Sequence, residues 1–322
     1  MLTQRMPETV SIVGAGRVGR VLGRRLHEGG WRVGAVTGRS VSTARAAVRA
    51  IGAGQPLVGL THQILNSRIV LITTPDSAIE GVAKNLAQIG AREWCGKVVL
   101  HTSGTLDVGV LQPLADLGAA TGSMHPMQTF SHQNSPNLAK SIFGIDGCPA
   151  ALLVARKMIH EMDGVAVRLS GANKAAYHAA GSFASGYVLT LIEAATRILM
   201  TQGFKRRQAM RALLPLTRQT LDNFERVGPF TAWTGPLARG DFSTIERHIQ
   251  ALADFEPEYL QAYKALARLM AQVLSAQPSA VLKQLDRIFG AVAVSKKKRA
   301  RKIRNSPRPT FATVDSRSQG AS

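Results

Sequence analysis

The segment Thr9-Val10-Ser11-Ile12-Val13-Gly14-Ala15-Gly16-Arg17-Val18-Gly19-Arg20 lies near the start of the sequence. Its pattern predicts a buried strand, a glycine turn and the beginning of a helix. Gly14 allows a sharp turn off the strand, Gly16 leaves room for a phosphate beside the backbone, and Gly19 lets the helix pack closely on the sheet. The helix N-terminus would offer free N–H groups to the phosphates. We therefore predict a dinucleotide site formed by Gly14, Ala15, Gly16, Arg17, Val18 and Gly19.

The composition predicts a globular protein with two domains. The chain has 322 residues, of which 45% are hydrophobic. Its only cysteines, Cys95 and Cys148, exclude a disulfide framework and a cysteine zinc site. The first residues have no apolar run, and charges or glycines interrupt the longest apolar stretches well short of about 18 residues. We therefore expect a cytoplasmic protein with no signal peptide and no membrane span.

The formal net charge of +20 is unevenly distributed. The last 28 residues, from Ser295 onward, contribute +8 of it. The body of the chain is nevertheless basic, which suits an anionic cofactor or substrate.

The end of the predicted second strand, Trp31–Val36, favours NADP over NAD. A site that prefers NAD carries an acidic residue there to bind the ribose hydroxyls. This sequence has no acidic residue between Glu28 and Asp76, and instead has Arg39 and Ser40, a cation and a hydroxyl suited to a 2′-phosphate. The alternative is that Arg39 is only a solvated surface residue.

The apolar run at residues 68–73 predicts another strand, which ends at Thr73, Thr74 and Pro75. Open α/β sheets bind ligands at the carboxyl ends of their strands, so these three residues are predicted cofactor neighbours. The following Asp76 is more simply explained as a helix N-cap than as a catalytic group.

Strand patterns continue to alternate with helical ones as far as residue 170. Further strands are expected at residues 97–100, 119–124, 141–145 and 165–169. The fold class is therefore α/β, with a doubly wound parallel Rossmann sheet in an NADP-binding domain at 8–170. Residues 171–292 have only helical patterns and form an all-helical substrate and dimerisation domain. The Lys- and Arg-rich segment 293–322 is predicted to be a disordered tail.

Lys174 and His178 are the first catalytic candidates. They lie at positions i and i+4 on the first long helix of the second domain, so they share a face. Small residues surround them, which favours close packing and partial burial. A desolvated lysine has a lowered pKa and becomes a usable acid or base. The alternative is a lysine at a helix start and a histidine hydrogen-bonded in a domain interface.

His101, Ser103 and His125 are further candidates for the same pocket. His101 and Ser103 follow a strand expected to end beside the nicotinamide, and His125 precedes Pro126 in a predicted non-helical turn. His101 could equally be a buried structural histidine. No carboxylate or cysteine joins these histidines at ligand spacing, so we expect no metal.

Six motifs carry a resemblance to a known family. They are G-A-G-R-V-G, T-T-P-D, H-T-S-G, S-M-H-P-M-Q-T-F, K-A-A-Y-H-A-A and T-G-P-L-A-R-G-D, in this order. Over about residues 8–290 the chain resembles uncharacterised bacterial predicted oxidoreductases, which join a Rossmann-like domain to a helical domain of unknown function of the DUF2520 type. In the last motif, Arg239 suits either an anionic ligand group or a carboxylate at a subunit contact.

More distantly, the layout is similar to β-hydroxyacid dehydrogenases, ketopantoate reductase and pyrroline-5-carboxylate reductase. In the first two, a lysine on the first helix after the Rossmann domain serves in proton transfer, and an asparagine follows four residues later. Lys174 matches that lysine, but His178 stands at the asparagine position, so the hydroxyacid substrate class does not carry over with it. The resemblance also implies a homodimer formed through the helical domain.

These observations predict an NADP-dependent oxidoreductase. Hydride would pass between the nicotinamide and a carbonyl or imine carbon of an unidentified small metabolite, with Lys174 as proton donor and His178 as its partner or substitute. One alternative is a non-catalytic NADP-binding sensor or scaffold. Another is weak electrostatic binding of nucleic acid by Lys296–Arg304, although this run lacks interleaved aromatic residues for base stacking.

Overall fold

The computed structural model describes residues 8–90, 92–131 and 136–290. By packing, the chain divides into a first unit, residues 1–189, and a second unit, residues 190–322. The predicted boundary after residue 170 follows the change in secondary structure, whereas the packing boundary falls inside α7 (Val188–Thr201). Lys174 therefore belongs to the first unit. The predicted basic tail at 293–322 lies outside the described residues.

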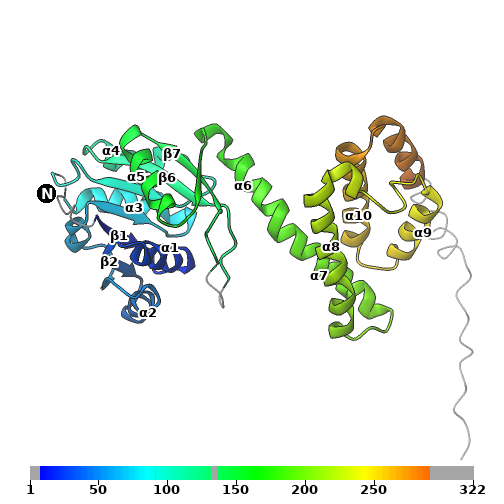
Figure 1. Ribbon diagram of the computed structural model, residues 1–322, viewed down its shortest axis with the longest axis horizontal. Coiled ribbons are helices and arrows are strands. Elements are labelled where there is room, and N and C mark those ends of the chain that lie inside the picture. The colour runs from blue at the N-terminus through cyan, green and yellow to red at the C-terminus, as the bar shows by residue number, and fades with distance from the viewer. Residues whose placement is uncertain (1–7, 91, 132–135, 291–322) are drawn as a thin grey trace, which may run out of the picture. The chain divides into compact units, whose positions relative to one another are not determined.

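In the described part of the first unit, eight strands form one sheet in the order β3-β2-β1-β4-β5-β6-β7-β8. Figure 1 shows this sheet with the helices that flank it. The strands are β1 (Thr9–Val13), β2 (Arg32–Gly38), β3 (Gln55–Val58), β4 (Ile69–Ile72), β5 (Val98–His101), β6 (Ala120–Pro126), β7 (Ile142–Gly147) and β8 (Val165–Arg168). The first six are parallel and have the strand order of a Rossmann sheet. The sheet order reverses between β1 and β4, so the ends of these two strands flank the expected ligand crevice.

The last two strands depart from the predicted all-parallel sheet. β7 pairs antiparallel with β6, and β8 then pairs parallel with β7. A parallel connection needs a crossover, usually a helix, and the described part of the chain between β6 and β7 contains none. The sheet is therefore mostly parallel, with one reversal.

Helices cover both faces of the sheet. One face packs on α1 (Arg17–Glu28), α2 (Val41–Ile51) and α5 (Pro149–His160), and the other on α3 (Asp76–Gln88) and α4 (Gln112–Ala115). Side chains alternate along β4: Ile69 and Leu71 join the first core, whereas Val70 and Ile72 join the second. Because both faces are covered, β4 is buried throughout and reads as a continuous apolar run.

Residues 171–290 are described as helices without a strand, as predicted. The helices are α6 (Lys174–Ser182), a π-helical turn Phe183–Tyr187, α7, α8 (Arg206–Ala232), α9 (Phe242–Leu252), α10 (Pro257–Leu274) and a last helix at 278–290. α8 contains a kink at Gly228, where φ is +77°. Asp241 caps α9 by accepting a hydrogen bond from the Thr244 N–H. Arg239 is exposed in the loop before it.

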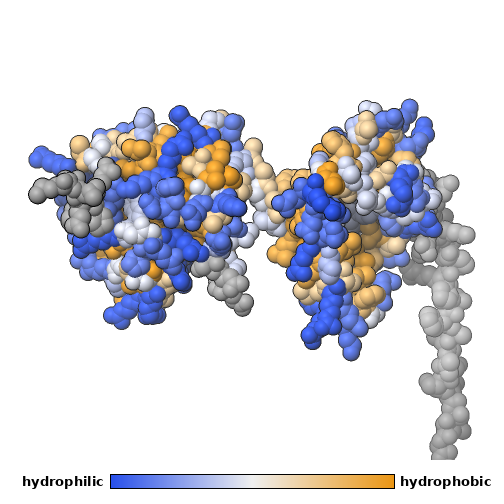
Figure 2. Space-filling view, in the orientation of Figure 1, coloured by the Kyte–Doolittle hydropathy of each residue, from blue (hydrophilic) through white to orange (hydrophobic). Residues whose placement is uncertain are grey.

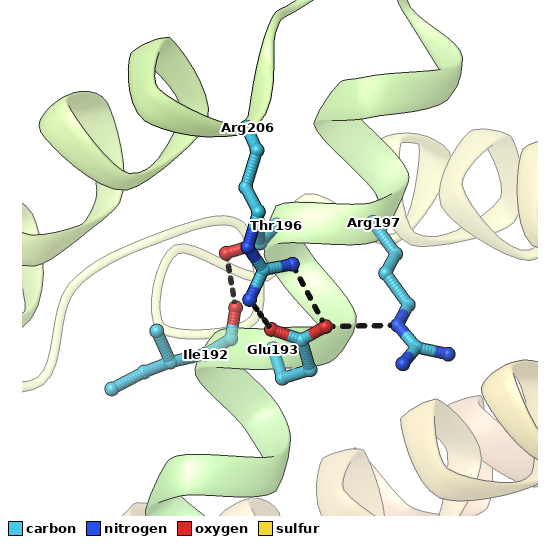
Figure 3. Close-up of polar contacts among 5 residues, drawn as sticks. All are labelled: Ile192, Glu193, Thr196, Arg197 and Arg206. Atoms are coloured by element: carbon cyan, nitrogen blue, oxygen red, sulfur yellow. Dashed lines mark hydrogen bonds and ion pairs between the residues drawn. The ribbon is translucent and has the colours of Figure 1, made fainter.

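The turn between α7 and α8 is closed by ion pairs on Glu193 (Figure 3). Arg206 reaches both carboxylate oxygens, at 3.1 and 2.7 Å, and Arg197 donates to Oε1 at 3.0 Å. These hydrogen bonds lower the pKa of Glu193 to about 2, with Arg206 the larger contributor. The cluster links two helices that follow each other in the second unit.

Among the described residues, one helix, Gly171–Thr201, is apolar and long enough to cross a membrane by length and composition alone. This corrects the expectation that every apolar stretch is too short. The lysine and glycines in the segment interrupt its apolar runs but do not reduce its average hydropathy enough to exclude it. A single helix of this kind is weak evidence for a membrane span, and the cytoplasmic location stays a prediction.

Candidate functional site

The glycine turn after β1 forms an open phosphate cradle. Gly14 has φ of +123°, and a Cβ there would lie 2.8 Å from the Thr73 carbonyl carbon. A Cβ on Gly19 would overlap the Gly14 carbonyl oxygen, so this glycine is needed for the close approach of α1 to the turn. A Cβ on Gly16 would meet nothing within 4 Å, and no side chain caps α1. The open space and the uncapped N–H groups fit a pyrophosphate.

Two threonines at the end of β4 lie beside this turn. The Thr73 hydroxyl donates to the Gly14 carbonyl oxygen at 2.8 Å and fixes the turn to β4. The next hydroxyl, of Thr74, is buried without a hydrogen-bond partner. An unsatisfied buried hydroxyl is costly unless a ligand or water completes it, so its place here fits a polar ligand. Pro75 follows as the N-cap residue of α3.

Arg39 and Ser40 follow β2 as expected, but they use their side chains differently. The Ser40 hydroxyl caps α2 by accepting from the Thr43 N–H at 3.3 Å, and the Thr43 hydroxyl caps Ser40 in return. Arg39 is exposed and forms no ion pair with the described residues. A 2′-phosphate contact by either residue stays a prediction, with Arg39 the freer group.

Asp76 and Ser103 hold together the loops that follow β4 and β5. Asp76 is the first residue of α3 and not its N-cap, so that prediction was wrong. Its carboxylate instead accepts from the Ser103 hydroxyl at 2.7 Å and from the Thr105 hydroxyl at 2.8 Å. Ser103 Oγ also accepts from the Thr105 and Leu106 N–H groups. These contacts give Ser103 a structural task, and a contact with substrate stays a prediction.

His101, the last residue of β5, is fully buried. Its Nδ1 accepts from the Ser103 N–H, and its Nε2 lies 3.2 Å from the Asp107 carbonyl oxygen, to which it donates. This network assigns the neutral Nε2–H form. Burial, and secondarily the charge of Lys174, lowers its pKa to about 4. Both ring nitrogens therefore hydrogen-bond to the loop after β5, which is what a buried structural histidine would do.

Lys174 is also fully buried, and its Nζ donates to the Ser123 hydroxyl at 2.7 Å. Burial lowers its pKa to about 8, against an opposing effect of nearby carboxylates led by Asp146. Ser123 lies in β6, in register with His101 on one side and Asp146 on the other. Sequence reasoning quoted the motif around Ser123 but gave this residue no role. The available signal was a polar residue inside an apolar strand.

His125 and His178 line a cleft of about 270 Å³. Their ring centroids are 5.6 Å apart, and a Cβ on Gly104 would lie 2.6 Å from His178 and 2.8 Å from His125. The glycine of the H-T-S-G motif therefore makes room for both rings. The other lining residues are Met127, Gln128, Thr129, Gly181, Ser182, Ala184 and Ser185.

The two cleft histidines differ in burial. His125 lies in β6 rather than in the predicted turn, and burial lowers its pKa to about 4. The Tyr177 hydroxyl donates to its carbonyl oxygen at 3.3 Å. His178 is exposed on α6, one turn beyond Lys174. Both imidazoles therefore line the cleft, whereas Lys174 is buried and is not among the lining residues.

Two family models match the chain. A Rossmann-like domain matches residues 3–126, and the domain of unknown function DUF2520 matches residues 141–270. The chain therefore combines a Rossmann-like domain with a DUF2520 domain, in this order. No curated protein is similar enough in sequence to count as a match.

Solved structures share this fold at low sequence identity. A protein from Bacteroides fragilis, provisionally assigned as an NADP oxidoreductase, is 21% identical with a TM-score of 0.68, over 82% of this chain and 98% of that one. The imine reductase of Streptomyces aurantiacus is 17% identical with a TM-score of 0.62, over 86% and 99%. The pyrroline carboxylate reductase of Plasmodium falciparum, solved with NADP bound, is 12% identical with a TM-score of 0.53, over 80% and 96%. At these identities the likeness shows the fold.

Proposed function

We propose that the chain is an NADP-dependent oxidoreductase that transfers hydride between the nicotinamide and a carbonyl or imine carbon of a small molecule. The observation that carries this proposal is that the phosphate turn and the cleft lie at the same end of the sheet, where its parallel strands finish. The open phosphate turn follows β1, and the cleft with its two imidazoles lies beyond β5 and β6. The carboxyl ends of these parallel strands share one edge, so a dinucleotide bound at the turn would extend toward the cleft. The NADP oxidoreductases of the same fold support it.

The residues present fit the cofactor, and different residues would bind it and supply the proton. NADPH would supply the hydride when bound. The backbone N–H groups at Gly16 and Arg17 would hold its pyrophosphate, and the free Thr74 hydroxyl would complete the polar contacts. His178, exposed on the cleft, is placed to donate a proton to the oxygen or nitrogen formed. Lys174, which is buried and donates to the Ser123 hydroxyl, has a lowered pKa and could exchange a proton near neutral pH.

The cofactor preference is tested by binding. NADPH is expected to bind more tightly than NADH, and Arg39→Ala is expected to narrow the difference by weakening NADPH alone. The control Arg45→Ala removes an exposed arginine of the following helix, α2, and should leave the affinities for both cofactors unchanged. Fluorescence titration measures all three proteins. Equal affinities for the two cofactors in the wild type would contradict the assignment of a 2′-phosphate site.

Turnover separates an enzyme from a sensor. In a screen of carbonyl and imine substrates we expect NADPH oxidation that falls strongly in His178→Ala and Lys174→Ala. Both variants should retain NADPH affinity, because neither residue lies in the phosphate turn. Tight NADPH binding with no turnover on any substrate would favour the non-catalytic sensor.

We also propose that the second unit forms a homodimer. α8 exposes large apolar side chains, and hydrophobic surface on the helical unit is visible in Figure 2. The residues are Leu216, Leu221, Phe224, Val227 and Phe230. Exposed apolar patches of this kind mark interaction sites, and a second copy of the chain is the partner that the family resemblance implies. Sedimentation equilibrium should give the mass of two chains.

A further inference from the structure

Arg17 forms a direct bond between the phosphate turn and the segment that borders the cleft. It is the first residue of α1, and its Nη1 donates to the Phe130 carbonyl oxygen at 3.0 Å, although the two residues lie 113 positions apart. Nothing in the glycine pattern anticipates this contact. The bond therefore gives Arg17 a specific task in addition to its backbone place in the turn.

The segment at 127–130 forms one wall of the cleft. Met127, Gln128 and Thr129 line the cleft, and Phe130 packs on the same apolar core as Ala15 and Val18 from the turn and helix α1. The Met127 N–H donates to the Ile142 carbonyl oxygen at 2.8 Å, which ties the beginning of the segment to β7. The far end is tied to the turn through Phe130.

The Arg17 side chain has hydrogen-bonding capacity left over. A guanidinium has five N–H donors in a planar fork, and among the described residues one of them is engaged, on Phe130. The side chain is exposed at the uncapped end of α1, where the pyrophosphate is expected. A guanidinium fork is well suited to bind phosphate oxygens with two donors at once.

We propose that Arg17 is a positioning residue that couples cofactor binding to the shape of the cleft. Its free N–H groups bind the cofactor pyrophosphate while Nη1 keeps the Phe130 carbonyl oxygen, so the bound cofactor fixes residues 127–130. This inference rests on the proposed cofactor site and adds an order to the reaction, in which the cofactor binds first and prepares the wall of the cleft. By thermodynamic reciprocity, a ligand in the cleft then tightens cofactor binding by the same factor.

Hydrogen exchange on the full chain tests the coupling without a substrate. NADP⁺ at a saturating concentration, verified by calorimetry, should slow amide exchange of the 127–130 segment by at least about fivefold, the lower end of typical coupling factors. Arg17→Ala should bind NADP⁺ more weakly and, once saturated, show no slowing in this segment. Arg17→Lys keeps the positive charge for the phosphate but lacks the planar fork, and should also lose the slowing. The matched control Arg24→Ala removes an exposed arginine from the same helix and should behave like the wild type.

The outcomes separate the two proposals. If the wild type does not bind NADP⁺, both the proposed function and the coupling are overturned. If NADP⁺ binds but exchange at 127–130 is unchanged, or slows equally in Arg17→Ala, the cofactor site stands and the coupling through Arg17 is overturned. Slowing in the wild type and in Arg24→Ala, with none in the two Arg17 variants, supports the coupling.

Discussion

The two units cover their apolar side chains to different extents. In the first unit, helices on both faces bury the central strands β4 and β5, and exposed large apolar residues lie mainly on the outer strands, such as Val165, and near the end of the unit, such as Phe183. In the second unit, α8 leaves Leu216 64%, Phe224 56% and Phe230 68% exposed. The first unit thus encloses two apolar cores around its central strands, whereas in the second unit α8 leaves an apolar face exposed. This difference matches the proposal that the first unit binds the ligands and the second unit associates with another copy of the chain.

The largest effect should come from the packing of the phosphate turn in the first unit. Gly19→Ala places a methyl group against the Gly14 carbonyl oxygen and the Thr73 hydroxyl. Because backbone atoms must move, we expect a loss of about 3 kcal/mol or more in the free energy of unfolding. Chemical denaturation measures it.

Gly16→Ala is the matched variant, since its methyl group meets no protein atom within 4 Å. Its free energy of unfolding should stay close to that of the wild type, while NADPH affinity falls because the methyl group occupies the phosphate approach. If Gly16→Ala binds NADPH normally, the turn is not the pyrophosphate site.

The next effect is the pH dependence of stability that Lys174 introduces. Folding lowers its pKa from the ordinary 10.5 to about 8, so between these pH values the unfolded chain binds more protons than the folded one. The free energy of unfolding should therefore rise with pH across this window, by about 3 kcal/mol from this residue. We would measure the free energy of unfolding of the wild type and of Lys174→Met at pH 7.5 and 10.5. The other titratable groups are the same in both proteins, so the difference between the two pH-dependent changes is the contribution of Lys174. Parallel pH profiles would show that the lysine is not desolvated.

Much of the fold could be predicted from the sequence because its signals are local. Continuous apolar runs such as residues 69–72 occur where helices cover both faces of a sheet, and Gly14 and Gly19 mark a turn that other residues do not fit. The reversal at β7 could not be predicted, since the direction of a strand is not encoded in the composition of the strand itself.

Of the five predicted catalytic residues, two line the cleft, and the roles of all five stay predictions. The two lining residues are His125 and His178, which lie 53 positions apart in the sequence. The tasks of Ser40 and Asp76 differ from those expected, because short polar side chains bond to whichever backbone or hydroxyl group folding brings near. Ser123 was missed for the same reason: its importance comes from Lys174, which reaches it across the fold.

A smaller effect tests the association surface of the second unit. Phe224→Glu introduces a charge into the exposed apolar face of α8 and should weaken dimerisation by about 30-fold, which corresponds to about 2 kcal/mol for a central aromatic residue. Sedimentation measures the change, and NADPH affinity should be unchanged because the phosphate turn lies in the other unit. The control Leu153→Glu, on the exposed side of α5, should leave the oligomeric state as it is. A wild type that is monomeric at all concentrations would contradict the proposed interface.

The smallest effect is expected at the ion cluster of the second unit. Glu193→Gln removes the pairing with Arg206 and Arg197, and the melting temperature should fall slightly at low salt and not at all at 1 M salt, because exposed charges are screened. Since folding lowers the pKa of Glu193 from 4.5 to about 2, its contribution is complete above pH 4.5 and is lost as the pH falls toward 2.

The control for this cluster is Glu80→Gln in the first unit, where a single Lys84 on the same helix is the partner. A pair within one helix stabilises only that helix, whereas the Glu193–Arg206 pair joins α7 to α8 across their connecting turn. The Glu193 variant should therefore lower the melting temperature of the second unit more than the Glu80 variant lowers that of the first. Equal shifts would mean that the Glu193–Arg206 pair adds nothing beyond a pair within one helix, and that the α7–α8 turn is held by its apolar contacts alone.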